Sequence, residues 1–186
     1  MDLRERKKAA TRLALHEAAL RLALEHGPDR VTVEAIADAA DVSRRTFSNY
    51  FAGKEDAIFH ADRLRLRGLV EAIRDRPAAE GPATAFRAGA ATLLADSDRL
   101  DPAWVAQRRL LRLHPSLLPH QVAAFAAVEG ELAAEAARRG ADPLRSRVLA
   151  ATFLATIRAA TAHWLEHPGR ALAEWVDEAL SPPASS

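Results

Sequence analysis

The sequence predicts an all-α protein in which a small head is followed by a larger helical body. Apolar residues recur three and four positions apart along most of the chain, which is the spacing of one buried helix face. Glycine and proline divide the chain into helix-length segments, and no stretch shows strand-like alternation of useful length. At 186 residues the chain has room for one ordinary domain, or for a small domain joined to a larger one.

The first helix is expected to end at Gly27-Pro28, because glycine followed by proline is the usual order at a helix C-terminus. Its buried stripe consists of Leu15, Ala18, Ala19 and Leu22. Basic residues crowd the start of this helix, although the net charge of the whole chain is only +1. A local basic face can bind phosphate even when the total charge is balanced. The basic residues are Arg4, Arg6, Lys7, Lys8 and Arg12.

Two short helices joined by a tight turn are predicted between Val33 and Lys54. Ser43 is placed to cap the second of them, because its hydroxyl can accept hydrogen bonds from the unpaired amides of the next turn. An aromatic set at i, i+3 and i+4 on that helix is expected to face inward, namely Phe47, Tyr50 and Phe51. The residues left facing outward are Arg44, Arg45, Thr46, Ser48 and Asn49.

These outward residue types suit contact with a DNA duplex. Arginine presents a planar pair of donors to guanine, asparagine can pair with adenine, and hydroxyls and lysine reach phosphates. We expect bases or nearby backbone to be contacted by Arg44, Arg45, Thr46 and Asn49, with Ser48 as a further contact, and phosphates by Thr32, Ser43, Tyr50 and Lys54. The alternative is a helical hairpin whose arginine pair is only a solvated face. The cap, the aromatic back and the helix lengths together favour DNA binding.

From about Arg12 to Ile58 the chain resembles the N-terminal domain of the TetR family of one-component transcriptional regulators. The matching motifs are L-x-x-A-A-x-x-L (Leu15, Ala18, Ala19, Leu22) before Gly27, T-V-x-x-I-A (Thr32 to Ala37), A-x-V-S-x-x-T-F (Ala40 to Phe47), N-Y-F (Asn49 to Phe51) and K-E-D-A-I (Lys54 to Ile58). Two positions depart from the pattern. Asp41 stands where the family often has glycine, and aspartate enters the left-handed region more easily than most residues. Ser48 stands where the family usually has an aromatic residue.

The resemblance implies a TetR-like fold, with a three-helix helix-turn-helix head at residues 1–53 and a ligand-binding and dimerisation body of about five or six helices at residues 54–180. It also implies a bacterial homodimer that represses transcription from a palindromic operator in double-stranded DNA. A small molecule bound in the body would release the operator by changing the separation of the two recognition helices. A dimeric DNA-binding regulator that does not respond to any ligand remains the alternative.

Beyond the head, a helix is expected from Lys54 to about Asp75. Further helical segments are predicted at roughly 82–97, 102–114, 117–140, 143–166 and 169–180, and residues 181–186 are expected to form a disordered tail. Segment 143–166 is almost wholly apolar in its middle, so we expect it to be buried on every side. A second copy of the chain is the simplest partner, and the family is implied to dimerise through its last two large helices, here 143–166 and 169–180. Small residues that permit close approach are Ala151, Ala155, Ala159 and Ala162.

Candidate ligand contacts are the bulky or polar residues within otherwise apolar helices of the body. They are Phe86, Trp104, Gln107, Arg108, Leu111, Phe125, Phe153 and Arg158. Arg158 lies in the most apolar segment, and an unpaired buried charge is costly. It is expected either to pair within the dimer with Glu129, Glu131 or Glu135, or to bind an anionic group of a ligand. Core packing explains Trp104 as well as a ligand does. The expected effector is apolar and can carry an acidic group.

Several function classes are not supported by the sequence. There is no cysteine, and we find no nucleophile–base pair, phosphate loop or carboxylate–histidine metal set, so we expect no enzyme and no cofactor. His114, His120 and His163 do not share a metal-binding spacing, which predicts no metal site. The first ten residues are charged and give no secretory signal, and no run approaches 18 apolar residues. We therefore expect a cytoplasmic protein with no membrane partner.

Overall fold

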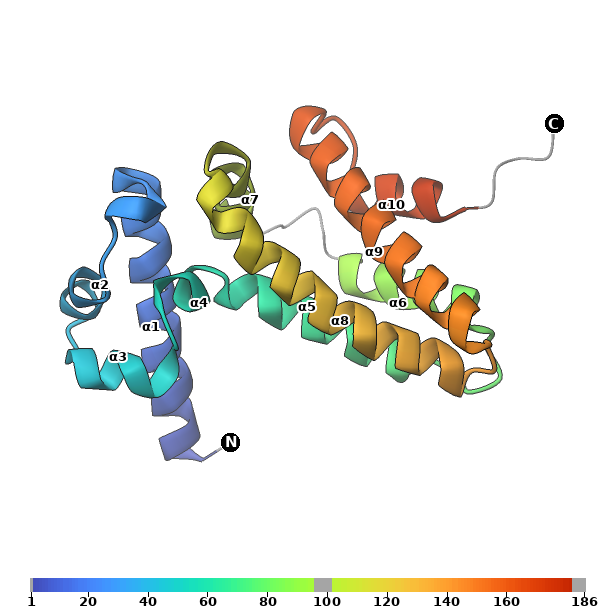
Figure 1. Ribbon diagram of the computed structural model, residues 1–186, viewed down its shortest axis with the longest axis horizontal. Coiled ribbons are helices and arrows are strands. Elements are labelled where there is room, and N and C mark those ends of the chain that lie inside the picture. Colours follow the sequence, from blue (N-terminus) through green and yellow to red (C-terminus); the bar gives the residue numbers. More distant parts are fainter. Residues whose placement is uncertain (1, 96–101, 182–186) are drawn as a thin grey trace. The chain divides into compact units, whose positions relative to one another are not determined.

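The computed structural model describes residues 2–95 and 102–181 (Figure 1). Within these residues the regular structure is helical throughout, so the prediction of an all-α fold is confirmed. The α-helices are α1 (Leu3–His26), α2 (Val33–Ala39), α3 (Arg44–Tyr50), α4 (Lys54–Ile58), α5 (His60–Arg74), α6 (Pro82–Leu94), α7 (Pro102–Leu113), α8 (Leu118–Arg138), α9 (Pro143–Glu166) and α10 (Leu172–Leu180). The predicted tail falls almost wholly on residues 182–186, which lie outside the described part of the chain.

The helices group into two compact units. Unit 1 comprises Met1–Leu64 and Asp101–Val122, and unit 2 comprises Arg65–Leu100 and Ala123–Ser186. The predicted head ended at residue 53, whereas unit 1 also contains α4 and α7, and the division between the units falls within α5. Helix α7 therefore packs with the head, although it lies in the middle of the sequence.

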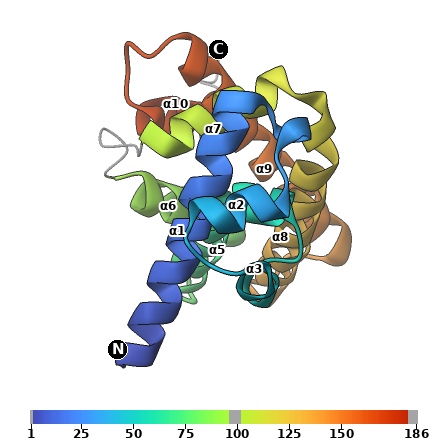
Figure 2. The same cartoon turned by 90° about the vertical axis from the view of Figure 1, so that its left-hand side faces the viewer.

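Unit 1 is built around α1, against which α2, α4 and α7 pack. Figure 2 shows α2 lying across α1. The predicted stripe of α1 is buried at Leu15, Ala18 and Ala19, while Leu22 is only partly buried. The helix ends at Gly27, whose φ of 80° lies in the left-handed region that glycine adopts without strain. Apolar residues from α2, α3, α4 and α7 complete one continuous core around this stripe.

The helix predicted from Lys54 to about Asp75 is interrupted at Phe59, and the chain forms α4 and α5 instead. The side chain of Phe59 is buried in the core of unit 1. The next residue, His60, lies with its ring 5.3 Å from that of Phe51 and 5.8 Å from that of His16. The sequence pattern missed the break because residues 54–75 contain neither glycine nor proline near Phe59, and the packing of Phe59 and His60 is tertiary.

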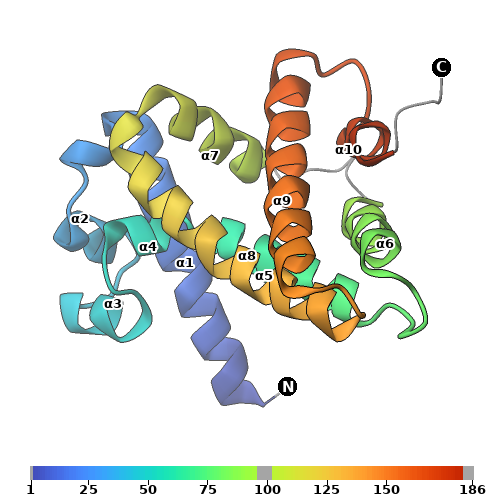
Figure 3. The same ribbon diagram turned by 45° about the vertical axis from the view of Figure 1, so that its right-hand side comes forward.

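In unit 2, α10 packs against both α9 and α6 (Figure 3). The rings of Phe86 on α6 and Phe153 on α9 lie 5.0 Å apart, and both side chains are buried. Helices α5 and α6 approach so closely at Gly89 that a Cβ there would lie 2.4 Å from Cγ1 and 2.9 Å from the backbone nitrogen of Ile73. Glycine is therefore required at this position for steric reasons.

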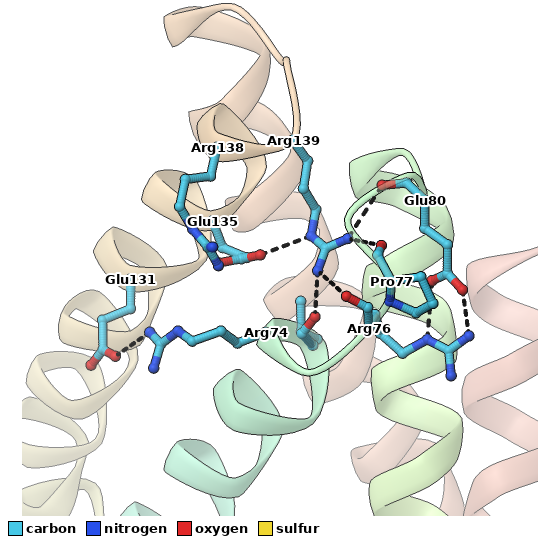
Figure 4. Close-up of polar contacts among 9 residues, drawn as sticks. Arg74, Arg76, Pro77, Glu80, Glu131, Glu135, Arg138 and Arg139 are labelled. Carbon is cyan, nitrogen blue, oxygen red and sulfur yellow. Dashed lines mark hydrogen bonds and ion pairs between the residues drawn. The ribbon is translucent and has the colours of Figure 1, made fainter.

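A buried arginine ties the end of α5 to the end of α8 (Figure 4). The guanidinium of Arg139 donates to a Glu135 carboxylate oxygen at 2.8 Å, and Glu135 is only 2% exposed and also paired with Arg138. Its remaining donors reach the carbonyls of Ile73 (2.9 Å), Arg76 (3.1 Å), Pro77 (2.8 Å) and Glu80 (3.3 Å). Burying this charge is tolerable because the carboxylate and the carbonyls together satisfy its donors.

Within the single chain, helix α9 is buried on only part of its surface. Only 22% of its most apolar 18-residue window is buried within the described chain, and its apolar side chains Leu144 and Val148 are 72% and 52% exposed. The side chain of Arg158 is exposed in the single chain, and its predicted burial depends on the second copy. Of the acids predicted to pair with Arg158 within a dimer, Glu135 pairs in the single chain with Arg138 and Arg139, and Glu131 lies 3.8 Å from Arg74.

The prediction of no membrane-spanning segment rested on the length of uninterrupted apolar runs in the sequence, and this criterion missed α9. Helix α9 is long and apolar enough to cross a membrane by length and composition. A single helix of this kind is weak support for a membrane protein, because the core helix of a soluble protein passes the same test.

Candidate nucleic-acid interface

The helix-turn-helix predicted from the sequence is formed by α2 and α3. Thr32 caps α2, with its hydroxyl accepting from the Ala35 amide at 3.1 Å. Ser43 caps α3 in the same way, accepting from the Thr46 amide at 3.0 Å, and the Ser43 and Thr46 hydroxyls lie 2.9 Å apart. In the turn, Asp41 adopts a φ of 52°, as expected for the position where the family often has glycine.

The back of α3 packs into unit 1 and fixes which residues face outward. Phe47 and Phe51 are buried, and Tyr50 is half-buried with the Arg12 guanidinium 5.5 Å from its ring centroid. Cation and ring attract each other at this distance, so α1 contributes to the position of Tyr50. The predicted contacts that are exposed on α3 are Arg44, Arg45, Ser48 and Asn49, while Thr46 is half-buried.

A groove lies between the first turns of α1 and the outer side of α3. Its volume is about 980 Å³, and α3 contributes Thr46, Asn49 and Tyr50 to its wall. From α1 and the residue before it, the groove is lined by Asp2, Leu3, Arg4, Glu5, Lys7, Lys8 and Thr11. Three cations therefore stand beside the residues predicted to contact DNA. The sequence had marked the basic cluster at the start of α1, but it did not assign Arg4, Lys7, Lys8 or Thr11 to the interface.

The hydroxyls on this surface are partly used within the protein. Thr32 and Ser43 cap helices, as described above. Ser48 donates from its hydroxyl to the Arg44 carbonyl at 3.2 Å, within α3. Each hydroxyl oxygen has further capacity to donate or accept, so a contact with phosphate remains compatible with these bonds.

Lys54 is engaged with the protein more than the sequence indicated. Its ammonium donates to the carbonyls of Pro28 at 2.9 Å and Val31 at 3.0 Å, and it lies 4.0 Å from the Glu55 carboxylate. A lysine has three donors, so at most one is left for a phosphate. Lys54, at the start of α4, thus holds the segment between α1 and α2 in place by hydrogen bonds to residues more than 20 positions earlier in the chain.

One ion pair lies directly on the predicted recognition helix. Nη1 of the Arg44 guanidinium forms an ion pair with Oε1 of Glu34 on α2, and the two atoms lie 2.8 Å apart. Both side chains are largely exposed, at 71% for Arg44 and 54% for Glu34. This pair could not be predicted from residue spacing, because the two residues lie on different helices.

The predicted ligand contacts fall into two separate groups. In unit 2, Phe86 and Phe153 are in contact, as described above, Phe125 on α8 is half-buried, and Arg158 is exposed. In unit 1, the candidates on α7 are Trp104, Gln107, Arg108 and Leu111, of which all but the half-buried Arg108 are buried.

The α7 residues form a polar cluster at the junction of α4 and α5. Gln107 donates from Nε2 to the Ile58 carbonyl at 2.9 Å. The buried Asp62 carboxylate accepts from Trp104 Nε1 at 3.0 Å and from Arg108 Nη2 at 2.6 Å. Among the described residues, Gln107 Oε1 and Arg108 Nε are buried without a hydrogen-bond partner. The charge of Asp62 is compensated within this cluster, which fastens α7 to the start of α5.

The histidine spacing needs one correction. His163 and His167 lie four residues apart, a spacing that the prediction of no metal site overlooked. Their rings are stacked with centroids 4.4 Å apart, and the ring of Trp175 meets that of His163 at the same distance. Among the described residues, no group of three or more histidine, cysteine, aspartate or glutamate side chains is arranged to bind a metal ion.

Comparisons with known proteins agree with this architecture. The family profile described as "Bacterial regulatory proteins, tetR family" matches residues 15–61, and the profile "MftR C-terminal domain" matches residues 80–184. The chain is 34% identical over 172 residues to the HTH-type transcriptional regulator TcmR of Streptomyces glaucescens, covering 87% of this chain and 76% of TcmR.

Two solved structures share the fold. The Thermus thermophilus FadR, a TetR-family transcriptional repressor in complex with lauroyl-CoA, superposes with a TM-score of 0.59 at 25% identity over 94% of this chain and 99% of FadR. The SmeT–triclosan complex superposes with a TM-score of 0.64 at 20% identity over 92% of this chain and 90% of SmeT. The profile matches, the identity to TcmR and the helix-turn-helix formed by α2 and α3 lead to one conclusion: the chain belongs to the TetR family of bacterial transcriptional regulators.

Proposed function

We propose that this regulator is a cytoplasmic homodimeric repressor that binds a palindromic operator through α3 and is released by a small apolar ligand, which can carry an acidic group. The observation that carries the DNA-binding part is the outer face of α3. Arg44, Arg45 and Asn49 are exposed on it, and the buried Phe47 orients it. The groove along α1 borders it, and three cations and two acids line this groove, namely Arg4, Lys7, Lys8, Asp2 and Glu5. The side chains that suit base edges are thus adjacent to cations that suit phosphates.

In this proposal the roles on the DNA surface are divided. Arg44, Arg45, Thr46 and Asn49 contact bases or the nearby backbone, and Thr32, Ser43, Tyr50 and Ser48 contact the backbone. Lys54 adds at most one phosphate contact. Arg4, Lys7 and Lys8 extend the backbone contact along the groove. A homodimer would place its two recognition helices about 34–36 Å apart, one turn of duplex, and would therefore select a palindrome.

The exposed apolar face of α9 supports the homodimer. Leu144, Val148, Ala155, Ala159 and Ala162 are exposed and follow one another at helical spacing. A large exposed apolar surface of this kind is usually covered by a partner. We propose that α9 and α10 of a second copy cover it, and that the exposed Arg158 either pairs with an acidic residue across this interface or contacts the ligand.

The ligand proposal rests on residues within each unit taken separately. In unit 1, Gln107 Oε1 and Arg108 Nε of α7 are buried without a hydrogen-bond partner among the described residues. In unit 2, the buried rings of Phe86 and Phe153 are in contact and make the interior apolar. The related FadR was solved with lauroyl-CoA, which supports an effector with a long apolar part. Because α7 is fastened to Ile58 and Asp62, a ligand that moves α7 would also move the start of α5. Release follows only if the ligand binds the DNA-incompetent state more tightly.

The experiment that tests the DNA-binding part is selection from a random duplex library by the purified protein at about 150 mM salt. An Arg44→Ala/Arg45→Ala double mutant is selected in parallel. We expect the wild type to enrich a palindrome that the mutant does not enrich. If both proteins enrich the same palindrome, α3 does not select the bases. If neither enriches anything after unfolding and refolding to remove a bound effector, the helix-turn-helix is only a scaffold.

Ligand response is tested separately by thermal unfolding with lauroyl-CoA. A ligand present at 100 times its dissociation constant stabilises the native state by roughly 2.7 kcal/mol. A rise in the melting temperature together with weaker operator binding supports a ligand-released repressor. Operator binding that no apolar acyl compound changes favours the ligand-independent regulator.

A further inference from the structure

Arg44, one of the residues proposed to contact bases, is already paired with an acid of the neighbouring helix. Glu34 is the second residue of α2, and Arg44 is the first residue of α3. The 2.8 Å contact between them spans the turn of the helix-turn-helix on its exposed side. The pair therefore lies on the surface that would face the duplex.

The pair is not needed to position the two helices. Packing of Ile36 and Ala37 on α2 and Phe47 on α3, all buried, fixes the helices relative to each other within unit 1. The Ser43 cap fixes the start of α3 independently. An exposed ion pair contributes little to stability because water screens it. The main effect of this pair is therefore on the orientation of the Arg44 side chain.

Pairing leaves Arg44 able to contact a guanine. A guanidinium has five N–H donors, and the contact to Glu34 uses Nη1. The donors on Nε and Nη2 remain, and they are sufficient for the two acceptors of guanine in the major groove. The carboxylate also restricts the rotamers of a long side chain, so less conformational entropy is lost when Arg44 meets a base.

Pairing also withdraws Arg44 from unspecific contact. A phosphate bound through Nε and Nη2 would place its negative charge close to the Glu34 carboxylate, whereas a guanine is neutral. Contact to phosphate is therefore penalised more than contact to guanine. A penalty on the wrong contact raises specificity without strengthening the right one.

We propose that Glu34 is a specificity-determining residue of this DNA-binding surface, which orients Arg44 toward a guanine in each half-site and suppresses its binding to phosphate. The proposal rests on the proposed function, since it requires that α3 contacts bases. Glu34 itself is a positioning residue, because it acts through Arg44.

The test repeats the duplex selection with two variants that each remove one negative charge from α2. Glu34→Gln removes the partner of Arg44. Asp38→Asn is the matched control, because Asp38 is exposed on the same helix one turn further along. We expect Glu34→Gln to enrich the wild-type palindrome with a preference for guanine at one position per half-site reduced about fivefold. It should also bind unselected duplex more tightly, with a salt dependence steeper by roughly 0.9 per added phosphate contact.

The control should strengthen binding to all sequences alike and leave every base preference unchanged. An Arg44→Lys variant keeps the charge but lacks the planar fork, so it should lose the same guanine preference as Glu34→Gln. The proposal is overturned if Glu34→Gln matches the control or the wild type in base preference. If the wild type enriches no palindrome, the proposed function itself fails. If the wild type enriches a palindrome and Glu34→Gln leaves the guanine preference unchanged, only the role of Glu34 is refuted.

Discussion

Single side chains in this protein serve the fold and the DNA surface at once. Thr32 and Ser43 cap helices, and Lys54 closes a turn, yet all three were predicted as phosphate contacts. The side-chain oxygen of a residue at a helix N-terminus accepts hydrogen bonds from the first backbone amides. Phosphates approach the same end of the helix, because its amides and its partial positive charge attract anions. Substitutions at such positions therefore change stability and binding together, and the two effects must be measured apart.

Lys54→Ala is expected to destabilise the protein as well as to weaken DNA binding. It leaves the carbonyls of Pro28 and Val31 without their donor, which should lower the free energy of unfolding by about 1–3 kcal/mol. Lys8→Ala is the matched control, because Lys8 is exposed in the groove. It should leave the urea midpoint unchanged and reduce the salt slope of binding by about 0.9. If Lys54→Ala leaves the urea midpoint unchanged, its bonds to the carbonyls are dispensable.

The charge of Glu135 makes stability depend on acid pH. Burial raises the pKa of Glu135, but hydrogen bonds from Arg138 and Arg139 outweigh burial and bring the pKa below its ordinary value. The stabilisation is thus fully present above the unfolded pKa of about 4.3 and is lost as pH falls through the lower folded pKa.

Glu135→Gln should remove this stabilisation and leave the buried Arg139 charge without its acid. We expect a loss of about 3–5 kcal/mol in the free energy of unfolding at pH 7, measured by urea. The difference from the wild type should shrink as pH falls below about 4. A difference that stays constant between pH 7 and pH 3 would show that Glu135 does not titrate with folding.

At the scale of elements, helix boundaries follow from local residues, and helix contacts follow from steric fit. Gly27 ends α1, and Ser43 begins α3, as the sequence indicates. The interruption at Phe59 and the attachment of α7 to Ile58 and Asp62 arise from packing and hydrogen bonds between distant segments. These features decide how a movement of α7 would reach the head.

Two glycine substitutions separate steric fit from helix propensity. Gly89→Ala would place a methyl group against Ile73, including its backbone, and should destabilise the protein by about 1–3 kcal/mol. Gly130→Ala is the matched control, since a Cβ there meets nothing within 4 Å inside α8. It should stabilise the protein by about 0.5–1 kcal/mol through helix propensity. Urea unfolding of both variants measures the change in the free energy of unfolding. If both substitutions stabilise the protein, the close contact at Gly89 is contradicted.

At the scale of the whole molecule, the exposed apolar face of α9 is the feature that a single chain does not explain. Its Leu144 and Val148 are exposed, and the small residues Ala155 and Ala159 continue the same face. A monomer with such a face would be prone to aggregate. Assembly of two chains would also link the oligomeric state to DNA affinity, because one half-site binds far more weakly than two.

Ala155→Arg is expected to halve the molecular mass measured by sedimentation. The long charged side chain would be forced into the proposed close approach of two α9 helices, where burying an unpaired charge is costly. Leu113→Ser serves as a control, because Leu113 is an exposed apolar residue on α7 and not on α9. The proposed interface is wrong if Ala155→Arg remains a dimer, or if the wild type itself sediments as a monomer.

The sequence by itself determined the all-α class, the helix-turn-helix with its caps and inward aromatics, and the family. These features rest on spacing along the chain, such as Phe47 to Phe51, and on residues that act within one turn of themselves, such as Ser43 and Asp41. Helical periodicity and capping are local, so they can be recognised without knowing the fold.

Tertiary structure alone decided which charges meet. Three contacts join residues from different elements. They are the ion pair of Glu34 with Arg44, the hydrogen bonds of Lys54 to two carbonyls, and the hydrogen bonds of Arg139 to the residues at the end of α5. It also showed that Arg158 is exposed and that α7 packs with the head. The physical reason is that side-chain pairing depends on the distance between elements in space, and that distance follows from how the cores pack rather than from spacing along the chain.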